Sequence, residues 1–377
     1  MKLVYLDNAA TTKMSKKVVE EMIKSFEDIY GNPSSTHTLG QKAKAVVENA
    51  RHIVAKNLKV EAKEIVFTSG GAEGNNLVIK GFLKQNKDKG KHIITTKIEH
   101  STVLKTFESL EKQGYDVTYI DVTKDGIIDV EKLKKAVRKD TALVSVMFVN
   151  NETGVIQPIK EIGEFLKEKE IFFHTDAVQA IGKFEIYPKE LRIDALTVSS
   201  HKFYGPKGTG FVFIDKKYNI EKEIFGGSQE RNRRAGTENV NGILGTGVAL
   251  EEVYEKMEVI FEHEKKIQEY LEEKLKNEIG RIQKVEINGE NSRRVKNITN
   301  VFIENTDIQM LLVALDMRGI CVSGGSACMS GSLENSYVLE AMGLNDEKLK
   351  SSFRISIGKD TTIEEIDYFI ENLKEII

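Results

Sequence analysis

Short β-rich runs alternate with segments of helical length between residues 64 and 214 of this 377-residue chain. The runs are rich in Val, Ile, Phe and Thr, and the segments between them are amphipathic and rich in Lys and Glu. This alternation is typical of βαβ units, in which helices cover a mostly parallel sheet. The expected strands are 64–68, 92–96, 117–120, 143–149, 171–174, 195–199 and 210–214. The sequence therefore predicts an α/β fold.

The C-terminal part differs in pattern. A charged segment from about 250 to 278 contains no glycine and predicts one helix that connects two domains. We expect a large domain over 13–260 and a smaller α+β domain formed by 1–12 together with 261–377. Thr361-Thr362-Ile363-Glu364 fits a capping box for a last helix. That helix has one apolar face, made of Ile363, Ile366, Phe369, Ile370, Leu373 and Ile376.

Charge and composition exclude some classes of partner. The 55 basic and 58 acidic residues nearly cancel and form no block of like charge, so direct nucleic-acid binding is not expected. No apolar run suits a signal peptide or the roughly 18-residue span of a membrane helix, which predicts a cytoplasmic protein without membrane contact. In that reducing compartment, a disulfide between Cys321 and Cys328 is not expected.

A glycine-rich segment, Ser69-Gly70-Gly71-Ala72-Glu73-Gly74-Asn75-Asn76, lies between the strand at 64–68 and a helical pattern. Ligands of open α/β sheets bind beyond the carboxyl ends of strands, and glycines at a helix start let backbone N–H groups approach an anion. The segment is a candidate phosphate cradle. An ordinary glycine-rich turn is the alternative, because neither common nucleotide fingerprint fits.

Two charged side chains lie at the carboxyl ends of other strands of the predicted sheet. Asp176 follows the strand at 171–174, where a buried carboxylate needs a cationic or donor partner; a helix N-cap is the alternative. Lys202 follows Ser199, Ser200 and His201 at the end of 195–199. A lysine in such surroundings can form a Schiff base, although most lysines are solvated surface charges.

The two cysteines lie in different settings. Cys321 stands between Ile320 and Val322, which is typical of a buried thiol. Cys328 lies in a small and polar run of Ser, Gly and Ala from 322 to 332, where a thiol can be accessible. Cys328 is therefore the reactive candidate.

Together these segments resemble the cysteine desulfurases, pyridoxal 5'-phosphate (PLP) enzymes of the class V aminotransferase group with the fold type I architecture. The resemblance spans almost the whole chain. It rests on the order and spacing of Tyr5 to Thr12, Gly31-Asn32-Pro33-Ser34-Ser35, Asp176-Ala177-Val178-Gln179, Ser200-His201-Lys202 and Gly325-Ser326-Ala327-Cys328.

The resemblance implies a set of cofactor contacts. Lys202 binds PLP as an imine, Asp176 pairs with the pyridine nitrogen, and Gln179 bonds the phenolic oxygen. His100 stacks on the ring and shuttles protons. The phosphate lies on the Gly71 and Ala72 backbone, although relatives often have Thr or Ser at the position of Ala72. The remaining cofactor-binding residues are Asn151, Ser199, Ser200, His201 and, reaching the cofactor of the neighbouring subunit of a homodimer, Thr237.

The resemblance also implies a reaction. Arg354 binds the carboxylate of L-cysteine with help from Asn151. Lys202 removes the α-proton, and the Cys328 thiolate attacks the substrate sulfur, which leaves a persulfide on Cys328 and releases L-alanine. A nearby cation or His100 would have to favour the thiolate. No metal site is expected, except that Cys328 could ligate an iron–sulfur cluster in transfer.

The spacing from Cys328 to Val338 resembles the subgroup with a longer cysteine loop, placed at about 322–336. Its members pass sulfur to acceptor or scaffold proteins for iron–sulfur cluster assembly or tRNA thiolation. Two alternatives stay open. One is a different reaction on the same scaffold, such as selenocysteine lyase or an aminotransferase. The other is a non-catalytic thiol scaffold or redox sensor that uses Cys321 and Cys328.

Overall fold

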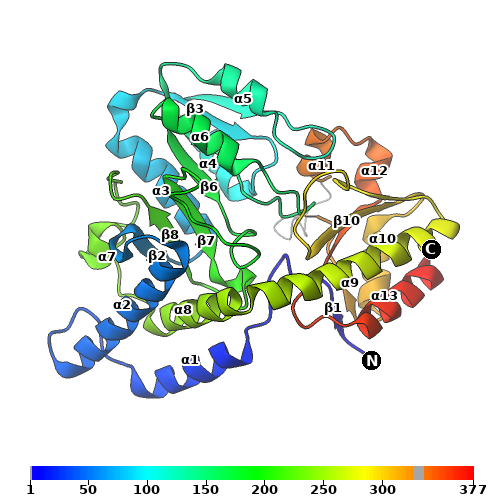
Figure 1. Cartoon of the computed structure of the whole chain (residues 1–377), viewed down its shortest axis with the longest axis horizontal. Helices are drawn as coiled ribbons and strands as arrows, with labels where there is room; N and C mark the ends of the chain where they lie inside the picture. The colour runs from blue at the N-terminus through cyan, green and yellow to red at the C-terminus, as the bar shows by residue number, and fades with distance from the viewer. Residues whose placement is uncertain (1, 326–334) are drawn as a thin grey trace.

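A sheet of seven strands forms the centre of the larger part of the structure, which is a computed structural model that describes residues 2–325 and 335–377 (Figure 1). The strand order is β2-β8-β7-β6-β5-β3-β4. Only β8 runs antiparallel to its neighbours, so the other six strands point the same way. The bounds are β2 (Ile65–Thr68), β3 (His92–Thr96), β4 (Asp116–Ile120), β5 (Thr141–Ser145), β6 (Phe172–Asp176), β7 (Ala195–Ser199) and β8 (Gly210–Ile214).

The α/β fold and the mostly parallel sheet predicted from the sequence are confirmed. One strand is shorter than expected, because β5 ends at Ser145 and not at Val149. Residues 146–149 are buried and still donate backbone hydrogen bonds to β6, from Val146 to His174 and from Phe148 to Asp176. These residues are therefore apolar because they are buried between β5 and the site, and not because the strand extends through them.

Both faces of the sheet are covered, because successive strand residues point to opposite sides. Phe173 and Phe211 belong to the core under α1, α2, α6 and α8, whereas Phe172 and Val212 belong to the core under α3 and α4. The helices of this part are α1 (Lys16–Asp28), α2 (Thr38–Leu58), α3 (Gly71–Gln85), α4 (Ser101–Glu111), α5 (Val130–Ala136), α6 (Ile159–Glu168), α7 (Gln229–Asn232) and α8 (Val240–Glu255).

The smaller part carries both chain termini at one end of the molecule (Figure 1). Its antiparallel sheet has the order β12-β10-β9, and a parallel pair joins β1 to β11. Val4 and Leu6 pack with α9, α10 and α13 in a separate apolar cluster. The elements are β1 (Val4–Tyr5), α9 (Met257–Asn277), β9 (Val285–Ile287), β10 (Ile298–Ile303), α10 (Ile308–Asp316), β11 (Ile320–Cys321), α11 (Tyr337–Ala341), α12 (Asp346–Lys350), β12 (Ser352–Ser356) and α13 (Ile363–Ile376).

Two helix predictions need correction. The connecting segment is not one helix, because α8 ends at Glu255 and α9 begins at Met257, with Lys256 outside helical geometry. The last helix is capped one residue later than predicted, by the reciprocal pair Thr362 and Glu365. The division at about residue 260 stays a prediction. No helix in residues 2–325 and 335–377 is long and apolar enough to span a membrane.

Candidate active site

The six strands that point the same way bring the predicted site residues to one edge of the sheet. His100 follows β3, Asp176 ends β6 and Lys202 follows β7. They line a cavity of about 260 Å³. The lining residues are Ala9, Ala10, Gly71, Ala72, His100, Thr102, Met147, Val149, Asn151, Asp176, Val178, Gln179, Ser199, His201, Lys202 and Arg354.

The amine of Lys202 is held at the wall of this cavity by the N-terminal segment. Its Nζ donates to the carbonyl oxygens of Ala9 at 2.6 Å and Ala10 at 2.7 Å. Gln179 donates from Nε2 to the same Ala9 oxygen at 2.9 Å. The segment after β1 thus crosses from the smaller part to the strand ends of the larger part. Its two carbonyls fix the position from which Lys202 can react.

Asp176 is 5% exposed and its carboxylate is engaged on both oxygens. Oδ2 accepts from Asn75 Nδ2 at 2.8 Å, and Oδ1 accepts from the backbone N–H of Val178 at 3.0 Å. A turn follows Asp176 and no helix begins there, so the alternative of a helix N-cap is wrong. Two donors hold the carboxyl group at the cavity wall, where it can meet a cationic ring nitrogen.

The glycine-rich segment does open a helix, because α3 begins at Gly71. Gly70 has φ of 145°, a conformation that strains other residues, and it gives no side-chain cap to the helix. The first N–H groups of a helix lack intrahelical acceptors, so they remain available to an anion. A second cavity of about 460 Å³ adjoins the first here and shares Ala10, Gly71, Ala72, Ser199 and His201 with it.

The other predicted phosphate ligands lie in three different settings. His201 lines both cavities, and burial together with Lys202 and Lys207 lowers its pKa to about 4, so it is neutral at neutral pH. The hydroxyl of Ser200 points elsewhere, since it hydrogen-bonds Thr246 Oγ1 at 2.7 Å and lies outside both cavity linings. Thr237 is exposed on the surface of the single chain.

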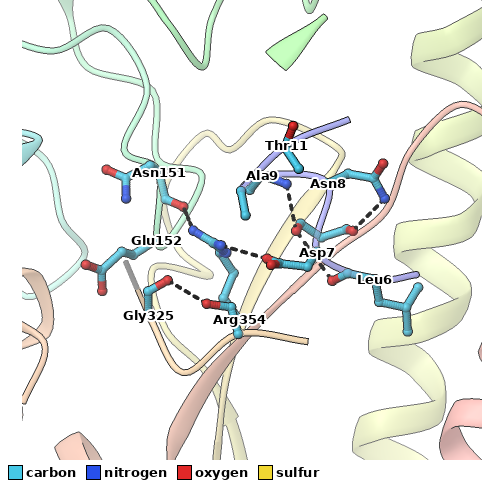
Figure 2. A network of polar contacts seen from close by, with 12 residues as sticks. Leu6, Asp7, Asn8, Ala9, Thr11, Asn151, Glu152, Gly325 and Arg354 are labelled. Carbon is cyan, nitrogen blue, oxygen red and sulfur yellow. Dashed lines mark hydrogen bonds and ion pairs between the residues drawn. The ribbon is translucent and has the colours of Figure 1, made fainter. Parts of the chain in front are cut away.

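Arg354 is a buried cation at the side of the cavity that belongs to β12. Figure 2 shows its guanidinium between the carbonyl of Asn151 and the carboxylate of Asp7, at 2.8 Å from each. Only 1% of Arg354 is exposed, and its Nε has no partner among the described residues. The amide oxygen of Asn151 likewise has no partner there. Both groups keep hydrogen-bonding capacity for a ligand.

Several residues beside the site carried no assigned role in the sequence prediction. Asn75 and Thr102 form hydrogen bonds next to Asp176 and His100, and Asp7 pairs with Arg354. Glu99 and Glu152 are fully buried carboxyls, and burial raises the pKa of both, that of Glu99 to about 8. Their position in the sequence could have pointed to them, since each lies in or close to a segment or residue that was already a functional candidate.

The two cysteines can be compared only in part. The sequence indicated a buried thiol at Cys321, but Cys321 on β11 is only half-buried. Burial raises the pKa of its thiol. Cys328 lies outside the described residues.

The fold and this site define a class of protein. Residues 4–369 match the aminotransferase class-V family, and the chain belongs to that family. It is 48% identical over its whole length to the cysteine desulfurase IscS of Clostridium botulinum strain Hall, covering 94% of that protein. It is 47% identical over its whole length to the IscS of Methanosarcina thermophila, covering 92% of it.

Solved structures agree. A NifS-like protein superposes with a TM-score of 0.93 at 38% identity, with 100% of this chain and 99% of that chain covered. SspA in complex with cysteine superposes with a TM-score of 0.84 at 35% identity, covering 95% and 100%. The architecture is the fold type I expected from the sequence. The protein is a cysteine desulfurase that acts on cysteine and depends on PLP.

The residues present fit that cofactor. The N-terminus of α3 suits a phosphate, the carboxylate of Asp176 suits a pyridinium nitrogen, and the amine of Lys202 suits an aldehyde. The unpartnered amide oxygen of Asn151 lies in the same wall. The residues present therefore include a counterpart for the phosphate, the ring nitrogen and the aldehyde of PLP.

Proposed function

We propose that Lys202 binds the aldehyde carbon of PLP, that Asp176 holds the ring nitrogen and that Gln179 holds the phenolic oxygen. The observation that carries this assignment is the convergence of Lys202, Asp176 and Arg354 on one cavity. When bound, PLP withdraws electrons from the α-carbon of the substrate. His100 is proposed to act beside the ring, which its place in the lining of the same cavity supports.

The phosphate of the cofactor is proposed to lie on the backbone of Gly71 and Ala72, with Ser199 and His201 beside it. The chain has Ala at position 72, so that residue offers an N–H but no hydroxyl. Ser200 stays in the proposed set as a prediction from the resemblance alone, because its hydroxyl is bonded to Thr246 and its backbone N–H donates to the carbonyl of Thr209.

A homodimer with shared sites is proposed to complete each phosphate site with Thr237. The exposed position of Thr237 supports this, as does a group of large apolar side chains left exposed on the single chain. Ile23 and Phe26 on α1 are 54% and 64% exposed, and Tyr30 and Phe225 are 73% and 71% exposed. Light scattering on the purified protein tests this proposal, and a monomer with full activity would contradict it.

The substrate is proposed to bind through its carboxylate to Arg354, assisted by Asn151. Lys202 then takes the α-proton and later returns one. The Cys328 thiolate attacks the sulfur of the substrate and forms an S–S bond while the carbon–sulfur bond breaks. The electron pair of that bond stays with the carbon, which is protonated to give L-alanine, and Cys328 carries the persulfide.

The persulfide sulfur is proposed to pass to acceptor or scaffold proteins for iron–sulfur cluster assembly or tRNA thiolation, in the cytoplasm. The similarity to cysteine desulfurases named IscS supports this assignment. The identity of the acceptor stays a prediction, as does the ligation of a transferred cluster by Cys328.

The test is incubation of the PLP-loaded protein with L-cysteine, with alanine measured and the Cys328 peptide analysed by mass. Cys328→Ser should abolish alanine formation from cysteine and leave the cofactor absorbance intact. Lys202→Ala should prevent borohydride from trapping the cofactor on the protein. Alanine and sulfide released by Cys328→Ser at the wild-type rate would refute the persulfide route and favour a lyase reaction on the same scaffold.

A further inference from the structure

The imidazole of His100 serves as the N-terminal cap of α4. Its Nδ1 accepts a hydrogen bond from the backbone N–H of Thr102 at 3.2 Å. Helix N-caps are usually Ser, Thr, Asp or Asn, whose side-chain oxygens accept such bonds. A backbone N–H can only donate, so Nδ1 must present its lone pair. The neutral ring therefore carries its proton on Nε2.

The hydroxyl of Thr102 strengthens this arrangement. Its Oγ1 lies 2.9 Å from His100 Nδ1 and 2.9 Å from Asn75 Nδ2. The amide nitrogen of Asn75 donates to that oxygen, which leaves the hydroxyl proton free to turn toward Nδ1. His100 Nδ1 then receives two donors, an N–H and an O–H, both from Thr102.

The orientation of Asn75 is itself determined by Asp176. Asn75 is fully buried in α3, and its Nδ2 donates to Asp176 Oδ2 at 2.8 Å. The opposite orientation of the amide would place its oxygen against a carboxylate oxygen, which is repulsive. Asp176 therefore fixes the orientation of the Asn75 amide, Asn75 fixes the direction of the Thr102 hydroxyl, and Thr102 fixes the protonation of His100 Nδ1.

We propose that Asn75 and Thr102 are positioning residues that hold His100 as the neutral tautomer protonated on Nε2, so that His100 meets the substrate as a hydrogen-bond donor. A proton on Nδ1 would face the N–H of Thr102, which cannot turn away. The positive end of the α4 dipole also disfavours a cationic ring. His100 in the resting enzyme is then not the base that ionises the Cys328 thiol.

Magic-angle-spinning NMR of the full chain with PLP bound and with ¹⁵N-labelled histidine measures the tautomer directly. The His100 signals are assigned by their loss in His100→Gln. At neutral pH we expect an unprotonated Nδ1 and a protonated Nε2. A proton on Nδ1, or on both nitrogens, would overturn the inference.

Variants test whether the two neighbours act as stated. Thr102→Val and Asn75→Leu should each move part of the proton to Nδ1. Thr102→Val should also slow single-turnover alanine formation about fivefold to tenfold, the effect of one hydrogen bond, with the KM for cysteine and the cofactor absorbance retained. Asn75→Leu should slow it at least as much and should also alter the cofactor absorbance, because Asn75 donates to Asp176 as well. The double variant should be no slower than Asn75→Leu alone, and Thr102→Ser should recover most of the loss seen in Thr102→Val.

Thr106→Val is the matched control, because Thr106 lies one turn further along α4 and, within the described part of the chain, its hydroxyl bonds only the carbonyl of Thr102. If Thr102→Val and Thr106→Val give the same tautomer and the same rate, the positioning role is refuted. The role at the substrate rests on the proposed function, but the tautomer does not. Absence of alanine formation by the wild-type protein would refute the proposed function alone, and the NMR result would still decide the inference.

Discussion

The carboxylate of Asp7 forms an ion pair of 2.8 Å with the guanidinium of Arg354, 347 residues away in the chain. The pair joins the segment after β1 to β12, next to the carbonyl of Asn151 (Figure 2). Arg354 is almost fully buried, whereas the side chain of Asp7 is 20% exposed. Asp7 therefore balances and orients the cation that is proposed to bind the substrate carboxylate.

Asp7→Asn should raise the KM for cysteine about tenfold, because the loss of a charged hydrogen bond leaves the fork of Arg354 less well oriented. It should also lower the urea midpoint of unfolding, since a buried cation loses its counter-charge. Steady-state kinetics and urea unfolding measure the two effects. Asp121→Asn is the control, because its ion pairs with Lys97 and Lys132 are exposed. An unchanged KM in Asp7→Asn would contradict the orienting role.

Glu152 contacts both ends of the segment that carries Cys328. Its Oε2 accepts from the hydroxyl of Ser336, and a Cβ placed on Gly325 would lie 3.4 Å from the same oxygen. Glu152→Ala removes the acceptor of Ser336 and the side chain that lies beside Gly325. We expect persulfide formation to slow about tenfold with little change in the KM for cysteine, because orientation of the reacting groups is lost and substrate binding is not.

Single-turnover mass analysis of the Cys328 peptide measures that rate. Glu152→Gln keeps an oxygen acceptor for Ser336 and should be less impaired than Glu152→Ala. Glu340→Ala is a suitable control, because Glu340 is exposed on the neighbouring helix α11. Equal rates in Glu152→Ala and Glu340→Ala would show that Glu152 does not position the segment.

Glu99 should make the stability of the protein depend on pH. Burial raises its pKa from 4.5 to about 8, although Thr96 Oγ1 and the N–H of Met147 donate to it at 2.7 and 2.9 Å. The folded state thus holds a proton that the unfolded state releases above pH 4.5. The stabilising effect of the neutral form is complete below pH 4.5 and is lost as the pH rises through about 8.

Glu99→Gln should remove this dependence and be more stable than the wild type at pH 9, by an amount on the order of a few kcal/mol. Urea unfolding at several pH values between 4.5 and 9 measures it. Glu108→Gln is the control, because the ion pair that Glu108 forms with Lys105 is exposed. Parallel pH curves for wild type and Glu99→Gln would mean that Glu99 is ionised throughout.

The sequence predicted those parts of the site that depend on local patterns. Asp176, Lys202 and the Gly70-Gly71 segment lie at the ends of predicted strands. Those strands could be recognised from short local runs of apolar residues, so the position of the three at the sheet edge could be inferred. The pairing of Asp7 with Arg354 could not, because no local pattern links positions so far apart. The direction of the Ser200 hydroxyl was equally hidden, since it depends on Thr246 in α8.

Resemblance to a family supplied roles, and it did not supply the contacts that enforce them. Asn75 stands in the glycine-rich segment that the sequence marked and Thr102 lies two residues after His100, yet their hydrogen bonds depend on how α3 packs beside α4 and β6. The capping error at Thr361 has a similar cause. Two adjacent threonines fit the pattern equally well, and the hydroxyl of Thr361 accepts instead from the N–H of Gly358.

Arg51 and Glu230 form a deeply buried ion pair in the described part of the chain, and its contribution to stability can be tested simply. Both side chains are 3% exposed, and the two nitrogens of the fork each lie 2.7 Å from a carboxylate oxygen. Glu230 also accepts from the N–H of Phe67 in β2. The pair thus ties α2 and α7 to the strand that leads into the Gly70-Gly71 segment.

Arg51→Met should destabilise the protein by about 3–5 kcal/mol, because it leaves the Glu230 carboxylate buried without its cation. The double variant Arg51→Met/Glu230→Leu should be more stable than Arg51→Met, since the uncompensated charge is gone. Urea unfolding of the PLP-loaded protein measures both. Arg231→Ala is the control, because Arg231 pairs with Glu48 in a partly exposed contact and should cost no more than about 1 kcal/mol. If the double variant is less stable than Arg51→Met, the hydrogen bond between the Glu230 carboxylate and Phe67 contributes more to stability than the balance of charge does.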